Sequence, residues 1–132
     1  MLTWRLCGGL FLGFLLLLSG CKDSGTEPSP NAPAGGGTVS FSKDVLPLFN
    51  NAGCTGCHGS SGGLSVGTVA ALQTGGNHGP AIIAGEADSS ILVRKLLTPP
   101  PFGARMPAGG AQLPDASINI IRTWINEGAA NN

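Results

Sequence analysis

The chain has 132 residues, 42% of them hydrophobic, and its formal net charge at pH 7 is zero. It lacks the basic excess that nucleic-acid-binding domains show, so we expect no nucleic acid among its partners. Only 5% of its residues are aromatic and four are cysteines, so large apolar surface for a core is scarce and the cysteine spacing is informative.

The first 20 residues have the pattern of a secretory signal peptide. One charged residue, Arg5, precedes an apolar run over residues 6–18, and Ser19 and Gly20 follow. The run is shorter than the about 20 residues that cross a bilayer and is typical of a signal-peptide core. We therefore expect export and cleavage of residues 1–20. An uncleaved signal anchor and an ordinary secretory signal are the alternatives.

Residues 18–21 read Leu-Ser-Gly-Cys, which resembles the lipobox of bacterial lipoproteins. The resemblance implies cleavage before Cys21 and lipidation of its sulfur with several acyl chains, enough for stable anchoring. The rest of residues 21–38 has no large apolar side chain and is predicted to be a disordered tether. Lys22 stands where enteric inner-membrane lipoproteins have aspartate. We therefore expect an exported protein of the cell envelope, facing the periplasm, on the outer membrane of a Gram-negative host.

Residues 39–132 are predicted to form one domain of short helices joined by glycine-rich loops. Helical spacing of apolar residues predicts helices over residues 41–49, 66–73, 88–97 and 115–127. Ser42 or Asp44 would cap the first helix, whose first turn would have to contain Pro47, and Asp88 would cap the third. No alternating run predicts a strand, so the expected fold class is all-α.

Residues 54–58 read Cys-Thr-Gly-Cys-His, a spacing at which two cysteines can form thioethers with a haem while the histidine binds its iron. Cys54 and Cys57 are therefore predicted to hold one haem c covalently, with His58 as the proximal ligand. Two other interpretations have less support. A thioredoxin-like dithiol would need a βαβ context, and a structural zinc site would need four ligands, for which only His78 could join these three.

The second axial position is predicted to be filled by Met106, the only methionine after the signal peptide. It lies in a glycine-rich loop before the last helix, and Pro107 restricts its conformation. Two alternatives remain. Met106 could be core filler, and His78 could be the distal ligand instead, which would give bis-histidine coordination and a lower reduction potential.

A helix before the C-x-x-C-H motif, a Met-Pro loop and a closing helix with an aromatic residue resemble class I cytochromes c. The chain is more similar still to the short cytochrome c domains of planctomycetes and other bacterial lipoproteins. The similar segments are residues 41–47, 54–58, 85–92, 105–107 and 121–129. The resemblance implies a small helical domain wrapped around one haem, with its terminal helices packed across each other. It also implies that a proline carbonyl in a Gly-Pro pair, here Pro80, holds the proximal imidazole.

No grouping of serine, histidine and acid indicates an enzyme. The expected function is that of a membrane-tethered c-type cytochrome that carries single electrons through a six-coordinate His/Met haem and docks transiently with redox partner proteins. One alternative is a haem protein with a labile distal site that binds a small ligand or turns over peroxide. Another is a docking accessory of a larger redox complex.

Overall fold

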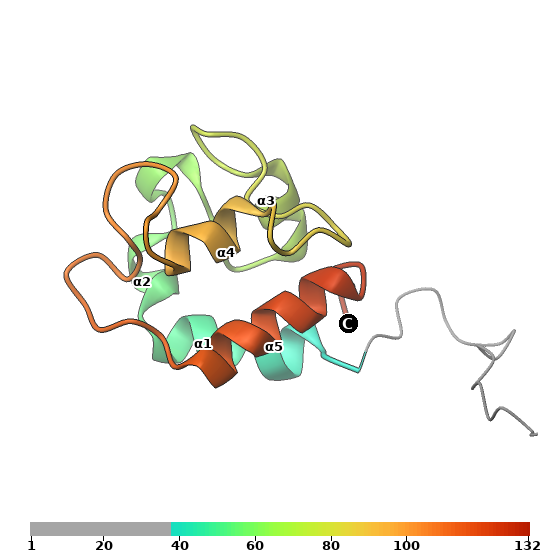
Figure 1. Ribbon diagram of the computed structural model, residues 1–132. Helices are drawn as coiled ribbons and strands as arrows, with labels where there is room; N and C mark the ends of the chain where they lie inside the picture. The colour runs from blue at the N-terminus through green and yellow to red at the C-terminus, as the bar shows by residue number, and fades with distance from the viewer. Residues whose placement is uncertain (1–37) are drawn as a thin grey trace, which may run out of the picture.

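The computed structural model describes residues 38–132, which form a helical domain (Figure 1). Its elements are η1 (Phe41–Val45, a π-helix), α1 (Leu46–Asn51), α2 (Cys54–Cys57), η2 (Ser61–Gly63, a 3₁₀-helix), α3 (Val69–Thr74), α4 (Ile91–Leu96) and α5 (Asp115–Asn126). Within residues 38–132 the β-structure is one isolated bridge between Gly76 and Gly79. The prediction of an all-α fold is thus confirmed.

The signal peptide, Cys21 and all but the last residue of the predicted tether lie outside the described residues. In the part of the chain that the structure describes, no helix combines the length and apolar character needed to cross a membrane.

The first helical segment runs without a break from η1 into α1, and Ser40 caps it. The Ser40 hydroxyl accepts a hydrogen bond from the Lys43 amide at 3.2 Å, and the Asp44 carboxylate accepts one from the Ser40 amide at 2.8 Å. The predicted caps, Ser42 and Asp44, were therefore wrong, because Asp44 instead acts as the reciprocal partner of the cap. Pro47 is the second residue of α1, at the point where the π-helix passes into the α-helix.

Helix α3 begins later than the apolar pattern of residues 66–73 predicts. The Thr68 hydroxyl accepts a hydrogen bond from the Ala71 amide at 3.2 Å and so caps a helix that starts at Val69. Val66, which the prediction placed in the helix, is buried in the extended segment before it. Burial of an apolar side chain is therefore not enough to extend the helix when a capping threonine follows.

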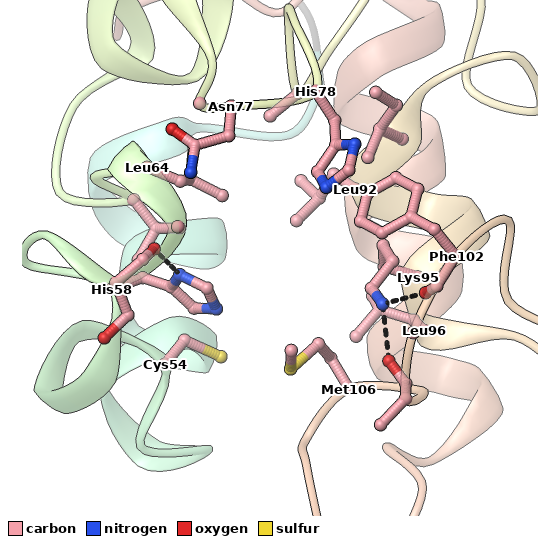
Figure 2. A pocket seen from close by; sticks show the side chains of 18 of the residues that line it. Cys54, His58, Leu64, Asn77, His78, Leu92, Lys95, Leu96, Phe102 and Met106 are labelled. Carbon is pink, nitrogen blue, oxygen red and sulfur yellow. Dashed lines mark hydrogen bonds between the residues drawn. The ribbon is translucent and has the colours of Figure 1, made fainter.

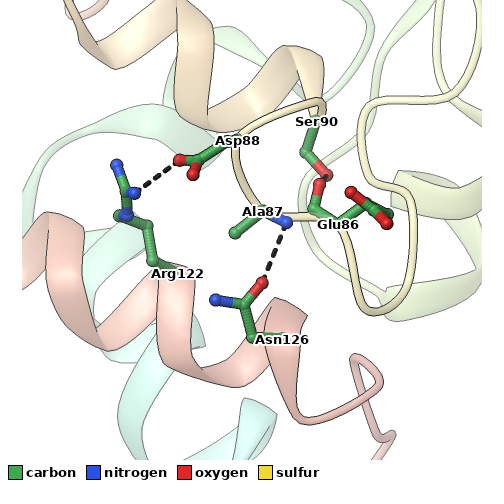
Figure 3. Close-up of polar contacts among 6 residues, drawn as sticks. All are labelled: Glu86, Ala87, Asp88, Ser90, Arg122 and Asn126. Atoms are coloured by element: carbon green, nitrogen blue, oxygen red, sulfur yellow. Dashed lines mark hydrogen bonds and ion pairs between the residues drawn. The ribbon is translucent and has the colours of Figure 1, made fainter.

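Helix α4 likewise starts at Ile91, after Ser90 rather than after the predicted cap Asp88. Asp88 instead forms an ion pair with Arg122 of α5 (Figure 3). Ser90 is fully buried, and its hydroxyl donates to the Glu86 carbonyl at 2.8 Å. The turn before α4 is thus held by its own hydroxyl and by contacts with α5.

Helix α5 carries the apolar stripe that the sequence predicts, and all four members of the stripe are buried: Ile118, Ile121, Trp124 and Ile125. The Trp124 ring packs against Phe41 of η1, with ring centroids 5.3 Å apart. Its indole N–H donates to the Ala130 carbonyl at 2.9 Å, so burial leaves no polar atom of the ring unpaired. The expected packing of the two terminal helices is confirmed.

The first described residues are fastened to the C-terminal end of α5. Glu127 accepts hydrogen bonds from the Thr38 hydroxyl at 2.5 Å and from the Val39 amide at 3.0 Å. The bond from Thr38, followed by that from the Val39 amide, lowers the pKa of Glu127 below its ordinary value. The Ser42 amide also donates to the Asn132 carbonyl at 2.9 Å. The two ends of the domain therefore lie side by side (Figure 1).

The loop after α3 turns back through a tight pair of backbone hydrogen bonds between Gly76 and Gly79, at 3.1 and 2.9 Å. Gly75, at its start, has φ +76°, and a Cβ there would lie 1.8 Å from the Gly79 carbonyl oxygen. Only glycine fits this position without a backbone shift.

We predict that Gly75→Ala lowers the free energy of unfolding by more than about 2 kcal/mol, because it adds overpacking to the strain of a positive φ. Gly85→Ala is the matched control. It has φ +82° with open space around the added methyl, so it should lose only about 1 kcal/mol. Denaturant unfolding of the full-length protein measures both, and equal losses would contradict the role of the Gly79 carbonyl.

Candidate functional site

A cavity of about 380 Å³ separates two walls of the domain (Figure 2). One wall is α2 with the segment after it, and the other is α4 with the methionine loop, defined as residues 97–114. Much of the lining is apolar and includes Phe49, Leu64, Val66, Leu92, Leu96 and Leu113. The volume and this lining are typical of a site for a small molecule or cofactor.

The structure brings three of the predicted site residues together in this cavity. Cys54 and His58 lie on one wall, and Met106 lies on the other with its sulfur directed into the space between (Figure 2). His78 lines the same cavity from a third segment, the loop before α4. Cys57 is exposed at the end of α2 and is not among the lining residues.

His58 is held in one orientation and one tautomer. Its backbone amide donates to the Cys54 carbonyl at 2.7 Å, and its carbonyl accepts from the Val66 amide at 3.1 Å. Its ring Nδ1 lies 3.0 Å from the Ser61 carbonyl oxygen. A carbonyl can only accept, so Nδ1 is the donor, and in the neutral ring this leaves the lone pair on Nε2. The side chain is thus prepared to bind a metal through Nε2.

The partner of the His58 ring corrects a prediction. The carbonyl that holds the imidazole belongs to Ser61, not to Pro80. The chain turns tightly after α2 into η2 and so returns the Ser61 carbonyl to the ring. Every residue has a carbonyl, so no side chain in the sequence could have indicated this partner.

The two cysteines stand at the two ends of the single-turn helix α2, and both are free thiols. Residues three apart lie on the same side of a helix, although Cys54 alone lines the cavity and Cys57 is exposed next to it. Burial raises the pKa of the Cys54 thiol above its ordinary value, a backbone hydrogen bond opposes this, and Cys57 adds to it. Cys54 therefore meets the apolar cavity as a neutral thiol.

Met106 is half-buried, and its position is set by backbone contacts within the methionine loop and to α4. Its amide donates to the Lys95 carbonyl at 2.7 Å. The Arg105 guanidinium donates to the Met106 carbonyl at 3.0 Å and to the Gly110 carbonyl at 3.1 Å. Guanidinium contacts with two carbonyls close the loop on itself directly beside the thioether.

The imidazole of His78 is packed against an aromatic ring. It stacks on Phe102 of the methionine loop, with ring centroids 3.8 Å apart and an interplanar angle of 20°. The His78 residue as a whole is exposed although it lines the cavity, and Figure 2 shows its ring beside Phe102. The stack thus joins the loop before α4 to the methionine loop after it. Substitution of His78 can test its role as an alternative ligand.

The residues present fit a haem c. An imidazole nitrogen and a thioether sulfur on facing walls are the axial ligand pair of cytochromes c, and a cysteine thiol lies on the imidazole side. The apolar lining suits the flat macrocycle. In residues 38–132 no three His, Cys, Asp or Glu side chains are grouped so that they could hold a metal ion by themselves.

One residue of the cavity wall was not predicted to matter. Lys95 belongs to the inward face of α4 and is only 9% exposed. The sequence did carry a signal, because Lys95 follows Ile91 at the helical spacing of the apolar residues and is next to Leu96. A lysine on a predicted apolar face is a reason to look for partners of its ammonium group.

Part of the chain is similar to a known protein family. Residues 54–107 match the family model described as planctomycete cytochrome C. The matched segment runs from Cys54 through Met106 to Pro107, and so contains Cys54, His58 and Met106 but not the lining residues Phe49 and Leu113. No curated protein and no solved structure matches the chain.

Proposed function

We propose that the chain, whose residues 54–107 match the family model described as planctomycete cytochrome C, is a c-type cytochrome that carries single electrons through one six-coordinate haem c. In this proposal Cys54 and Cys57 form the thioethers, His58 is the proximal ligand and Met106 is the distal ligand. The observation that carries the proposal is the placement of His58 and Met106 on facing walls of one apolar cavity (Figure 2).

When bound, the haem would supply a one-electron couple between ferrous and ferric iron. The hydrogen bond from Nδ1 of His58 to the Ser61 carbonyl keeps the ring orientation fixed and its Nε2 basic. Met106 offers a soft, neutral donor, which favours the ferrous state. If His58 and Met106 both bound the iron, no position would be left for an added ligand, and this would favour an electron carrier over an enzyme.

Transient docking of redox partners fits the exposed end of α2. Cys57 lies at the surface, while Cys54 of the same helical turn lines the cavity. The turn thus connects the interior site with the outside of the domain, and partner proteins would approach there.

The proposal places the domain outside the cytoplasm, on a membrane, with Cys21 as the lipidated residue. The support lies in residues 18–21, which resemble a lipobox, and in the apolar run before them. Stable anchoring by several acyl chains suits a carrier that exchanges electrons with partners on the same membrane.

The first test concerns covalent attachment. Haem should stay on the denatured wild-type polypeptide in a gel stained for haem peroxidase activity, because thioether bonds survive denaturation. The double variant Cys54→Ala, Cys57→Ala should lose the stain. Extraction of haem from the wild-type chain by acidic acetone would overturn the c-type assignment for this protein.

The second test concerns the distal ligand. Met106→Ala should abolish the weak far-red charge-transfer band of the ferric protein, lower the reduction potential and allow rapid CO binding to the ferrous form, because it vacates a coordination position. His78→Ala should leave all three readouts nearly unchanged.

If His78→Ala gives these losses and Met106→Ala does not, the protein is a bis-histidine cytochrome. Rapid CO binding by the wild-type protein would replace the electron carrier with a sensor or peroxidase-like module.

The third test concerns the anchor. Labelling with a radioactive fatty acid should mark the wild-type protein, and Cys21→Ala should abolish the label and leave an uncleaved precursor or a soluble species. In a Gram-negative host the labelled protein should fractionate with the outer membrane, and its confinement to the inner membrane would contradict the role given to Lys22.

A further inference from the structure

Lys95 is a positively charged residue in the cavity wall. It is 9% exposed, on the face of α4 that also carries the buried Leu96, while its neighbour Arg94 is exposed. Removing an ammonium group from water is unfavourable unless other groups replace the lost hydration. The partners of its ammonium group therefore indicate why a lysine occupies this position.

Those partners all belong to the methionine loop. The Lys95 Nζ donates to the carbonyls of Phe102 and Ala104, at 2.6 and 2.5 Å, and lies 4.5 Å from the centroid of the Phe102 ring. Within residues 38–132 no carboxylate forms an ion pair with it. Carbonyl dipoles and an aromatic face thus take the place of a counter-ion.

The main chain of the same residue holds the loop at a third point. The Lys95 carbonyl accepts a hydrogen bond from the Met106 amide at 2.7 Å. Residues 102, 104 and 106 are therefore all fastened to one residue of a helix. The methionine loop contains no helix or strand of its own, so these contacts have a large effect on where the thioether lies (Figure 2).

We propose that Lys95 is a positioning residue whose ammonium group holds the methionine loop on α4 and so keeps the Met106 sulfur directed into the cavity. The inference deepens the proposed function and rests on it for the role of the sulfur as a ligand. The holding of the loop itself stands on the three hydrogen bonds alone.

The experiment compares Lys95→Met, which keeps an unbranched chain of similar length without donors, with Lys95→Arg, which keeps charge and donors. Arg94→Met on the exposed side of the same helix is the matched control. All are prepared with haem attached, and the haem-stained gel verifies the loading of each variant.

Lys95→Met should weaken or abolish the far-red band and speed CO binding to the ferrous form about tenfold or more, as expected for the loss of hydrogen bonds from a charged donor. Lys95→Arg and Arg94→Met should retain the band and the slow binding. An intact band and unchanged CO binding in Lys95→Met would overturn the proposal.

Hydrogen exchange followed by mass spectrometry supplies a readout that does not depend on ligation. The peptide containing residues 102–106 should exchange faster in Lys95→Met than in the wild type or Arg94→Met, while peptides of α5 stay unchanged. If the wild type itself lacks the far-red band, Met106 ligation fails, yet faster exchange of this peptide still supports the role of Lys95, and unchanged exchange refutes it.

If Lys95→Met does not fold, hydrogen exchange of the wild-type protein provides the test instead. The Met106 amide should then be the most protected amide of residues 98–106, because its acceptor lies on a helix. Exchange of that amide as fast as its loop neighbours would overturn the proposal.

Discussion

The packing of Trp124 against Phe41 joins the last helix of the domain to the first, and the cavity depends on it. Through this contact α5 supports η1 and α1, which lead directly into α2 and the wall with Cys54 and His58. The same helix carries Arg122 and Asn126, which hold the turn before α4 (Figure 3). One helix thus supports both walls, and a loss of its packing would change their separation.

The two walls hold their candidate ligand atoms, the His58 nitrogen and the Met106 sulfur, in different ways. His58 follows a helical turn directly, and its ring is fixed by a backbone carbonyl three residues further on. Met106 lies in a long irregular loop, which Arg105 braces from within and which Lys95 of α4 holds from outside. A local constraint therefore holds the imidazole, and a constraint between segments holds the thioether. The proposal that Lys95 is a positioning residue follows from this difference.

The sequence predicted best those structural features that depend on the spacing of apolar residues within one segment. The stripe of α5 and its first residue were right, because four large apolar side chains at helical spacing have one way to be buried. The caps of η1 and α4 were wrong, since several polar residues stand near each start and long-range contacts select among them. Asp88, for example, pairs with Arg122 instead of capping α4. The hydrogen bond of His58 to the Ser61 carbonyl could not be predicted, because every residue type has the same backbone carbonyl.

The attachment of Thr38 and Val39 to Glu127 also determines where a force from the N-terminal side acts on the domain. These residues meet α5 at its C-terminal end, whereas the methionine loop enters the same helix at Asp115. A helix of 12 residues is about 18 Å long. A pull on the chain from its N-terminal side is therefore borne by the contacts around Glu127 and Trp124, about one helix length from Asp115, where the methionine loop joins α5. If the domain moves on a tether, as proposed, the load falls on that end of α5, while the loop that carries Met106 joins the helix at its other end.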